Sequence, residues 1–222
     1  MALDWKRMEN PPSARFRVRI LEAFPAHAAR LGWTDAALKA ACEEVQLTEG
    51  EAAVACPKGA ADLFDVFADR ADQAMLDALA DLDLPSMRIR EKVKAAVQLR
   101  LEAQALYKEA ARAMTRALAR PDRAPEAARI LWRTADRIWR ALGDTSTDEN
   151  FYTKRAILSG VLASTYARWF TDYTPDHSET WTFLDARIEN VMQFEKFKAR
   201  LKPISERVQE AVGVAARFRY GR

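Results

Sequence analysis

Hydrophobic residues recur every three or four positions along most of the chain, and no stretch shows the alternation of a β-strand. This spacing places apolar side chains on one face of an α-helix. The pattern predicts an all-α protein of about eight to ten helices. The expected helices cover approximately residues 13–31, 34–45, 48–56, 60–82, 86–118, 126–142, 147–170, 178–197 and 204–218.

The most apolar of these helices follows the polar segment GDTSTDENFYTKR, which begins at Gly143. Ser146 and Glu149 have capping-box spacing, so the helix is expected to start near Thr147. Its bulky residues repeat in adjacent pairs, at Ile157, Leu158, Val161, Leu162, Thr165, Tyr166, Trp169 and Phe170. Small residues between 156 and 164 occupy the opposite face, which is also expected to be buried. Such a helix belongs in a core, in a subunit interface or against a ligand.

Local signals mark other helix ends. Thr34 is a predicted N-cap, and Thr48 with Glu51 forms a second capping box. Ser86 is the predicted cap of one long helix to about Leu118, and Gly143 stands in a helix-stopping position. These breaks suggest three sections, which are a helical head over 13–83, a helical bundle over 84–202 and an amphipathic C-terminal helix over 203–222.

The composition is that of an ordinary soluble protein. Of 222 residues, 49% are hydrophobic and 30% are charged, with few glycines and prolines. No run of about 18 apolar residues predicts a membrane-spanning helix. The N-terminal stretch has no apolar signal core, so neither a secretory nor an organellar address is expected. Cys42 and Cys56 lack metal-ligand spacing and are expected to be buried thiols in a reducing compartment.

The three short helices and the longer one near the N-terminus resemble the helix-turn-helix head of TetR-type regulators. DNA binding requires cations that displace counterions from phosphates. Between residues 41 and 83, however, the sequence contains eleven acidic residues and only two basic ones, Lys58 and Arg70. The acids are Glu43, Glu44, Glu49, Glu51, Asp62, Asp65, Asp69, Asp72, Asp77, Asp81 and Asp83. This head is therefore expected to repel nucleic acid.

The basic residues concentrate between positions 88 and 140. They are Arg88, Arg90, Lys92, Lys94, Arg100, Lys108, Arg112, Arg116, Arg120, Arg123, Arg129, Arg133, Arg137 and Arg140. The simpler interpretation is that they lie on the solvated faces of long helices. The alternative is a patch that faces anionic lipid or an acidic partner.

Residue patterns that indicate catalysis are missing. Neither His27 nor His177 has a glutamate three residues upstream, so the Glu-x-x-His pairs of a helical di-iron site are excluded. The chain also has no phosphate-binding glycine loop, no nucleophile elbow and no paired metal cysteines. The sequence thus predicts a protein that is not an enzyme and holds no metal or cofactor.

The segment GDTSTDENFYTKR and the later pattern D-Y-T-P-D…T-W-x-F-L-x-x-R, from Asp172 to Arg187, resemble the ninth Coq protein family. LGWTDAAL, from residue 31, and KVKAAVQLRLEA, from residue 92, fit the same family. Its members are lipid-binding accessory proteins of ubiquinone (coenzyme Q) biosynthesis. The resemblance extends from about Ser13 to Phe194 and implies a TetR-like fold, a homodimer and a lipid in a hydrophobic pocket.

The resemblance also implies a partner. The family is associated with the di-iron hydroxylase of the demethoxyubiquinone ring, to which it is thought to present substrate. The partner-binding residues of its central motif match Asp148, Phe151, Tyr152 and Arg155, with Phe151 where the family usually has tryptophan. Exposed aromatics beside charges are typical of binding hot spots. The two aromatics could instead pack beneath the start of the helix.

Two further sites follow from the resemblance. The expected lipid-binding residues are Trp139, Leu158, Val161, Leu162, Tyr166, Trp169 and Trp181, although periodicity alone fits a plain core or dimer seam equally well. The expected membrane-binding residues of the last helix are Ile204, Val208, Val212 and Phe218. That helix could also fold back on the body. Since no transit peptide is visible, the implied location is the bacterial cytoplasm, peripheral at the inner membrane.

The sequence therefore predicts a non-catalytic protein that binds an isoprenoid quinone or its precursor and presents it to a ring hydroxylase. One alternative is a TetR-type transcriptional regulator that senses a hydrophobic ligand. A second is a structural adaptor that binds partners without lipid.

Overall fold

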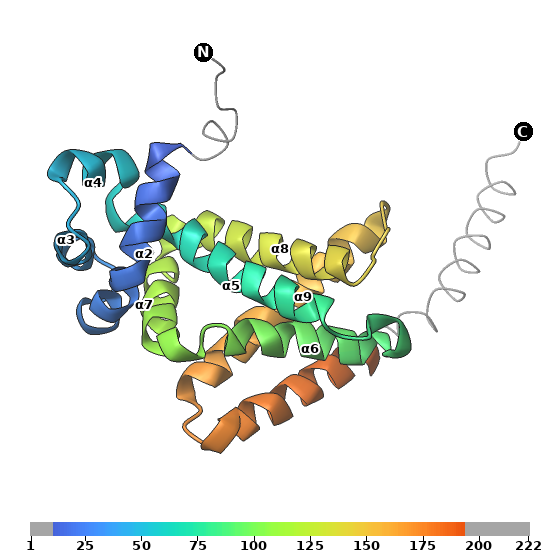
Figure 1. Cartoon of the computed structure of the whole chain (residues 1–222). Helices are drawn as coiled ribbons and strands as arrows, with labels where there is room; N and C mark the ends of the chain where they lie inside the picture. Colours follow the sequence, from blue (N-terminus) through green and yellow to red (C-terminus); the bar gives the residue numbers. More distant parts are fainter. Residues whose placement is uncertain (1–10, 194–222) are drawn as a thin grey trace, which may run out of the picture.

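The structure, a computed structural model, describes residues 11–193. Within this range it consists of α-helices and short 3-10 turns without any strand, which confirms the predicted all-α class (Figure 1). The helices are α2 (Pro12–Leu31), α3 (Asp35–Glu44), α4 (Glu49–Ala55), α5 (Leu63–Ala80), α6 (Ile89–Glu102), α7 (Lys108–Leu118), α8 (Ala124–Ala141), α9 (Glu149–Thr171) and a further helix over 178–193. The turns are η1 (Gly59–Asp62), η2 (Leu84–Ser86), η3 (Ala105–Tyr107), η4 (Pro121–Arg123) and η5 (Pro175–His177).

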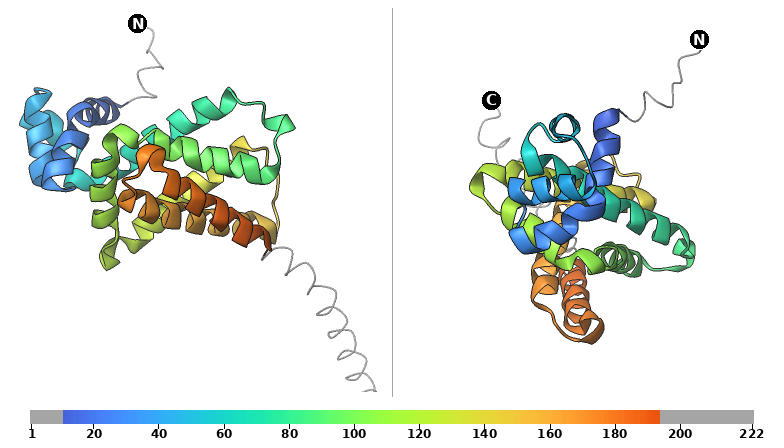
Figure 2. Two further views of the ribbon diagram at one scale, coloured as in Figure 1. Left: turned by 90° about the horizontal axis from the view of Figure 1, so that it is seen from below. Right: turned by 60° about the vertical axis from the view of Figure 1, so that its left-hand side comes forward.

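Helices α2, α3 and α4 gather at one end of the described chain and form what we call the head (Figures 1 and 2). The remaining helices form the body, in which the helix over 178–193 lies beside α6 and α9. Helix α5 packs against α2 on one side and against α6 and α8 on the other. The division at residue 83 stays a prediction, and α5 is a helix that both sections share.

Local capping forms the head helices as expected. The Thr34 hydroxyl accepts from the backbone N–H of Ala37 at 3.3 Å and caps α3. Thr48 and Glu51 form the predicted capping box at the start of α4. Each of these caps satisfies backbone donors that the first turn of a helix leaves unpaired.

An aromatic cluster around Trp33 joins the head to α5. The Trp33 ring stacks on Phe64 at a centroid distance of 5.1 Å and meets the edge of Phe24 at 4.7 Å. Its indole N–H donates to the carbonyl of Ala60 at 2.7 Å. All three rings are buried, so this cluster holds the orientation of the head on α5.

The predicted single helix from Ser86 to Leu118 is wrong in two respects. It begins at Ile89 because the Glu91 carboxylate accepts from the backbone N–H of Arg88 at 2.9 Å, whereas the Ser86 hydroxyl donates back to Asp83. It also breaks into α6, η3 and α7. The break contains no glycine or proline; Gln104 is instead held in the interior by Tyr166.

Helix α9 begins two residues later than expected. Its N-cap is Asp148, whose carboxylate accepts from the backbone N–H of Asn150 at 3.0 Å. Ser146 does not cap; its hydroxyl donates to Asp144 at 2.8 Å. The preceding helix ends at the predicted glycine, because Gly143 adopts a φ of +82° that other residues rarely take.

The small-residue face of α9 is not covered within the single chain. Ala156, Gly160 and Ala163 are all exposed, so the expectation that this face is buried is wrong for the isolated chain. The bulky face is buried as predicted and packs on α8 and α7. The C-terminal helix expected over 204–218, with Ile204, Val208, Val212 and Phe218, lies outside the described residues.

Candidate functional site

A cavity of about 210 Å³ lies between α5, α6, α7, α8 and α9 and opens to the surface beside exposed Thr115, Ala119 and Ala163. We call it the inner cavity. Its walls are mainly aliphatic and include Met114, Leu118, Ile130 and Leu131. Ligand pockets typically combine such apolar walls with a few placed polar groups. The inner cavity is therefore suited to the apolar part of a small molecule.

The buried polar groups of the inner cavity come from Arg100, Gln104 and Tyr166, each of which is more than nine-tenths buried, while exposed Thr115 adds a hydroxyl that donates to the carbonyl of Ala111. The Arg100 guanidinium donates from Nε to Asp72 Oδ1 at 2.7 Å and from Nη1 to the Tyr166 hydroxyl. Although burial alone would lower the pKa of Arg100, Tyr166 and Asp72 raise it above its usual value. Arg100 is thus a buried cation paired with a buried carboxylate that Arg137 shares.

The Tyr166 hydroxyl links Arg100 to Gln104 by hydrogen bonds. It accepts from Arg100 and donates to the Gln104 side-chain oxygen. Burial, the largest influence, raises the pKa of the phenol, so the hydroxyl keeps its proton at neutral pH. These three side chains form one connected polar cluster at the wall of an otherwise apolar cavity.

A second cavity, of about 290 Å³, lies between α6, α8, α9 and the helix over 178–193. We call it the outer cavity. Its apolar lining includes Val93, Ile157, Leu158, Val161, Ile188 and Val191. Asn150, Thr153 and Lys154, from the first turns of α9, supply polar lining. The outer cavity therefore adjoins the segment that carries the predicted partner-binding residues.

The seven predicted lipid-binding residues do not share one pocket, so the expectation of a single site is corrected. Trp139, Leu158 and Val161 line the outer cavity, whereas Tyr166 lines the inner one. The other three line neither cavity and are Leu162, Trp169 and Trp181.

Those three side chains have structural surroundings. Leu162 and Trp169 are fully buried in the hydrophobic core. Trp181 is half-buried, and its indole N–H donates to the carbonyl of Asp176 at 2.7 Å. Helical periodicity places residues on a face but does not show where that face is filled by neighbours and where it is hollow.

Three of the four predicted partner-binding residues lie at the surface at the start of α9. Asp148 is exposed, Phe151 is half-buried, and Tyr152 is 65% exposed. The Tyr152 ring lies 5.1 Å from that of Phe151 and 6.2 Å from that of Trp132 on α8. We call Asp148, Phe151, Tyr152 and Trp132 the aromatic face. The alternative that Tyr152 packs beneath the helix start is excluded by its exposure.

Arg155, the fourth predicted partner-binding residue, is 1% exposed and does not belong to that surface. Its guanidinium donates to Asp136 at 2.7 Å and to Asp144 at 3.0 Å. It also lies against the inner side of the Phe151 ring, 3.5 Å from the centroid. The motif that predicted a surface cation thus contains a buried one, because two carboxylates and a ring enclose it.

Asp144 joins this buried arginine to the outer cavity. Its Oδ1 accepts from Lys154 Nζ at 2.6 Å and from the Ser146 hydroxyl at 2.8 Å, while Oδ2 accepts from Arg155. Burial alone would raise the pKa of Asp144, but the bonds from Lys154, Ser146 and Arg155 outweigh burial and lower it. The loop before α9 is therefore tied to the helix by one ionised carboxylate.

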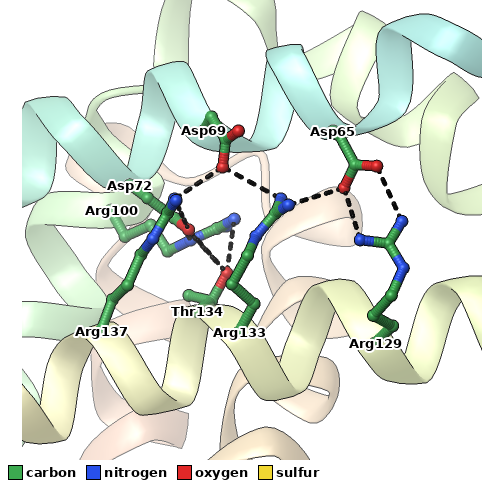
Figure 3. Close-up of polar contacts among 8 residues, drawn as sticks. All are labelled: Asp65, Asp69, Asp72, Arg100, Arg129, Arg133, Thr134 and Arg137. Carbon is green, nitrogen blue, oxygen red and sulfur yellow. Dashed lines mark hydrogen bonds and ion pairs between the residues drawn. The ribbon is translucent and has the colours of Figure 1, made fainter.

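Opposite charges also join α5 to α8 (Figure 3). Three aspartates on α5 face three arginines on α8, and these are Asp65, Asp69, Asp72, Arg129, Arg133 and Arg137. We call this set the charge ladder. Its distances include 2.7 Å from Arg133 to Asp65 and 2.6 Å from Arg137 to Asp69. The expectation that the basic residues lie on solvated faces holds for exposed Arg129 but is wrong for half-buried Arg133 and Arg137 and for buried Arg100.

The two cysteines that were expected to be buried are buried. Cys42 and Cys56 are buried free thiols, and burial raises the pKa of Cys56 to about 12. His27 pairs with exposed Glu44 at 2.7 Å. Among residues 11–193, no group of three or more His, Cys, Asp or Glu side chains is placed to hold a metal ion. Nor is any helix of the described chain long and apolar enough to cross a membrane.

Sequence reasoning missed the polar cluster, because Arg100 and Gln104 resemble ordinary surface residues of a helix. The sequence does contain a weak signal of this polar cluster. Gln104 and Arg100 are four residues apart, so they share a helix face with apolar Val97 and Leu101 nearby. A polar pair inside an apolar stripe indicates a buried polar site.

The fold belongs to the class of TetR-like all-α proteins, in which a small helical head is joined to a larger helical bundle. A solved TetR transcriptional regulator from Nitrosomonas europaea superposes with a TM-score of 0.62 at 17% sequence identity, over 79% of this chain and 97% of that one. At such identity the likeness concerns the fold alone.

The sequence comparisons identify the family. The COQ9 family model matches residues 124–195, which include α8, the aromatic face and α9. The probable ubiquinone biosynthesis protein coq9 of Dictyostelium discoideum is 26% identical over 89% of this chain and 64% of its own length. The human ubiquinone biosynthesis protein COQ9 is 28% identical over 90% of this chain and 64% of its own. The family model and these relatives support a member of the COQ9 family, and the chain spans 64% of the length of these two relatives.

Proposed function

We propose that this protein acts in ubiquinone biosynthesis as a non-catalytic lipid-binding protein that presents a prenylated quinone intermediate to a ring hydroxylase. The role in ubiquinone biosynthesis rests on the family, whose members carry that role in their names. The lipid-binding part is carried by one observation, which is the inner cavity with its aliphatic walls and single polar cluster. An interior of this kind favours an apolar chain with a small polar head.

The hydrophobic effect supplies the affinity for such a ligand. Burial of apolar surface stabilises a complex by roughly 25 cal/mol per Å², before the costs of ordering the ligand are subtracted. The outer cavity extends the available apolar surface between α6, α9 and the helix over 178–193. A prenyl chain is long and uniformly apolar, so it suits an interior with two hollows better than a compact ligand does.

The aromatic face is the surface at which we propose that the hydroxylase docks. Exposed Tyr152 and half-buried Phe151 stand beside Trp132, and Asp148 supplies a charge at the edge. Aromatic side chains in such clusters contribute much of the affinity of protein interfaces. Arg155 has a positioning role beneath this surface in place of the direct contact that the sequence suggested.

Three further parts of the proposal lie beyond the geometry of residues 11–193. We propose a homodimer, in which the exposed small-residue face of α9 is available for close approach of a second chain. We propose peripheral contact with the inner membrane of a bacterium through the amphipathic segment 204–218. We propose that the protein binds no nucleic acid, since Glu49 and Glu51 open the candidate recognition helix α4.

The direct test is mass spectrometry of lipids extracted from the natively purified protein. A prenylated quinone or precursor at near-stoichiometric amount is the expected result. Ala127→Trp on α8 fills the inner cavity and should reduce that amount severalfold, whereas Ala128→Trp, at the adjacent exposed position, should leave it unchanged. An empty wild-type protein, or one that holds bulk phospholipid alone, would instead favour the adaptor alternative.

A further inference from the structure

The hydrogen bonds of the polar cluster in the inner cavity all donate in one direction, from Arg100 to Tyr166 and from Tyr166 to Gln104. The Arg100 side chain has hydrogen-bond donors but no acceptor, so in its bond with Tyr166 the arginine must be the donor and the tyrosine oxygen the acceptor. Tyr166 must then accept from Arg100 and use its own proton elsewhere, and that proton goes to the Gln104 side-chain oxygen. In this arrangement the Gln104 side-chain oxygen faces the tyrosine, and its amide nitrogen does not.

The remaining end of the Gln104 side chain is its amide nitrogen, which carries two donors. Gln104 is 4% exposed and lines the inner cavity. Among the residues that the structure describes, no acceptor is assigned to this nitrogen. This nitrogen is not one of the fully enclosed side-chain atoms that lack a partner, so it is reachable from the cavity and its donors are available to a molecule bound there.

The break between α6 and α7 delivers this side chain to the cavity. A continuous helix was expected over residues 86–118, yet the chain leaves helical geometry after Glu102 and resumes it at Lys108. Gln104 precedes η3, and the same break leaves Leu106 93% exposed. Leucine side chains are usually buried and glutamine side chains usually exposed, and this break does the reverse. Such departures from local rules concentrate at functional sites.

From this geometry we infer that Gln104 is the specificity-determining residue of the inner cavity, and that it donates a hydrogen bond to a neutral oxygen acceptor on the bound molecule. The chemical class is an apolar molecule whose head carries a carbonyl-type oxygen, as in a quinone ring. This inference rests on the proposed lipid-binding function and names what distinguishes the ligand from other lipids.

The charges around the cluster favour a neutral head over an anionic one. Asp72 is fully buried, and its Oδ1 lies 2.7 Å from Arg100 Nε. The same carboxylate accepts from Arg137 and from the Thr134 hydroxyl. Each nitrogen of the Arg100 guanidinium already donates within the protein, to Asp72, Tyr166 and Thr134. A fatty-acid or phosphate head would therefore lose its hydration without meeting an unpaired guanidinium.

The test compares three probes of similar chain length, namely decylubiquinone, decylbenzene and decanoate, against the full-length protein. Binding is measured by quenching of tryptophan fluorescence or by calorimetry. Wild-type protein is expected to bind decylubiquinone more tightly than decylbenzene, and at least about tenfold more tightly than decanoate. A preference for decanoate would overturn the choice of a neutral head.

Gln104→Glu is the decisive variant, because a carboxylate still accepts from Tyr166 but has no donor for the ligand. It is expected to lower the affinity for decylubiquinone by about 3- to 10-fold and to leave decylbenzene nearly unaffected. Gln104→Leu, of similar volume, should do the same. Gln98→Leu on α6 is the matched control, since Gln98 pairs with Glu102 and does not line the cavity.

The outcomes separate the inference from the function on which it rests. If both Gln104 variants bind decylubiquinone as wild type does, or lose both probes equally, Gln104 does not read an oxygen and the inference is wrong. If wild-type protein binds none of the three probes, the lipid-binding function itself fails. Circular dichroism and thermal unfolding of each variant establish that the comparison concerns folded protein.

Discussion

The Arg155 guanidinium lies 3.5 Å from the centroid of the Phe151 ring, one turn earlier on α9. The N–H groups of the guanidinium donate to Asp136 and Asp144. A cation in this position attracts the ring face and fixes the ring in place. Phe151 in turn lies 5.1 Å from Tyr152, so the buried arginine supports an aromatic surface that it does not itself reach.

Replacing Arg155 by methionine is expected to destabilise the protein by about 3–5 kcal/mol, because it leaves two carboxylates without their buried cation. Urea unfolding monitored by circular dichroism measures the change. Arg155→Lys should recover part of the loss, since lysine keeps the charge but cannot reach both carboxylates with a planar fork. If the Arg155→Met protein were as stable as wild type but unable to bind the hydroxylase, Arg155 would have to contact the hydroxylase directly, and its positioning role would be wrong.

Tyr152→Ala should act on binding and hardly on folding. The side chain is 65% exposed, so its loss is expected to change the free energy of unfolding by less than about 1 kcal/mol. If the aromatic face docks the hydroxylase, the affinity should fall by about 2 kcal/mol, or roughly 30-fold. Calorimetry with the purified hydroxylase measures this, and quinone profiles of the cells should show the unhydroxylated precursor.

Tyr173→Ala provides the matched control for Tyr152. Tyr173 is 78% exposed and follows the other end of α9, away from the aromatic face. Its replacement should leave hydroxylase affinity and quinone profile unchanged. Equal behaviour of the two variants would contradict a docking site at the start of α9.

The helices that were predicted correctly are those whose ends carry local signals. Thr34, the Thr48–Glu51 pair and Gly143 act within one turn of their own positions, so the sequence around them suffices. The break before α7 has no such signal. It accompanies contacts of Gln104 with Tyr166, which is 62 residues away, and periodicity carries no information on contacts at that range.

Charged residues were the least predictable part of the candidate site. Arg155 and the arginines of α8 were placed at the surface because single-sequence patterns assign charges to solvent. Two matching stripes were nevertheless visible, since α5 and α8 carry opposite charges at nearly the same spacing. Whether such stripes face water or each other depends on helix packing, which the sequence alone did not reveal.

The charge ladder makes a paired prediction along one helix. Asp72→Asn removes the fully buried carboxylate that Arg100 and Arg137 share, and should cost about 3 kcal/mol or more. Asp69→Asn removes a carboxylate that is 42% exposed, and should cost less than about 1 kcal/mol. Thermal and urea unfolding of both variants test this order. Equal costs would show that burial does not set the strength of the ladder.

The N-terminal section over residues 13–83 supports a prediction about DNA. Asp65, Asp69 and Asp72 are neutralised by the charge ladder, so fewer acids oppose DNA than the eleven counted in the sequence. Helix α4 still presents Glu49 and Glu51 in its first turn. Fluorescence anisotropy with a labelled duplex should show no binding tighter than about 10⁻⁴ M at physiological salt. Tighter binding that weakens as salt rises would support the regulator alternative.

Asp144 predicts how stability depends on pH. Burial alone would raise the pKa of its carboxyl, but hydrogen bonds from Lys154, Ser146 and Arg155 lower it below the unfolded value of about 3.9. A group with a depressed folded pKa stabilises the protein above its unfolded pKa, and that contribution is lost as the pH falls below about 4. Asp144→Asn should therefore lower stability at pH 7 and flatten its decline between about pH 5 and pH 2. Urea unfolding across this range measures both effects. Asp122→Asn is the control, because it replaces an exposed carboxyl whose pKa is also lowered by Arg120. If the stability of Asp144→Asn declined as steeply with falling pH as that of wild type, other carboxylates would govern acid unfolding.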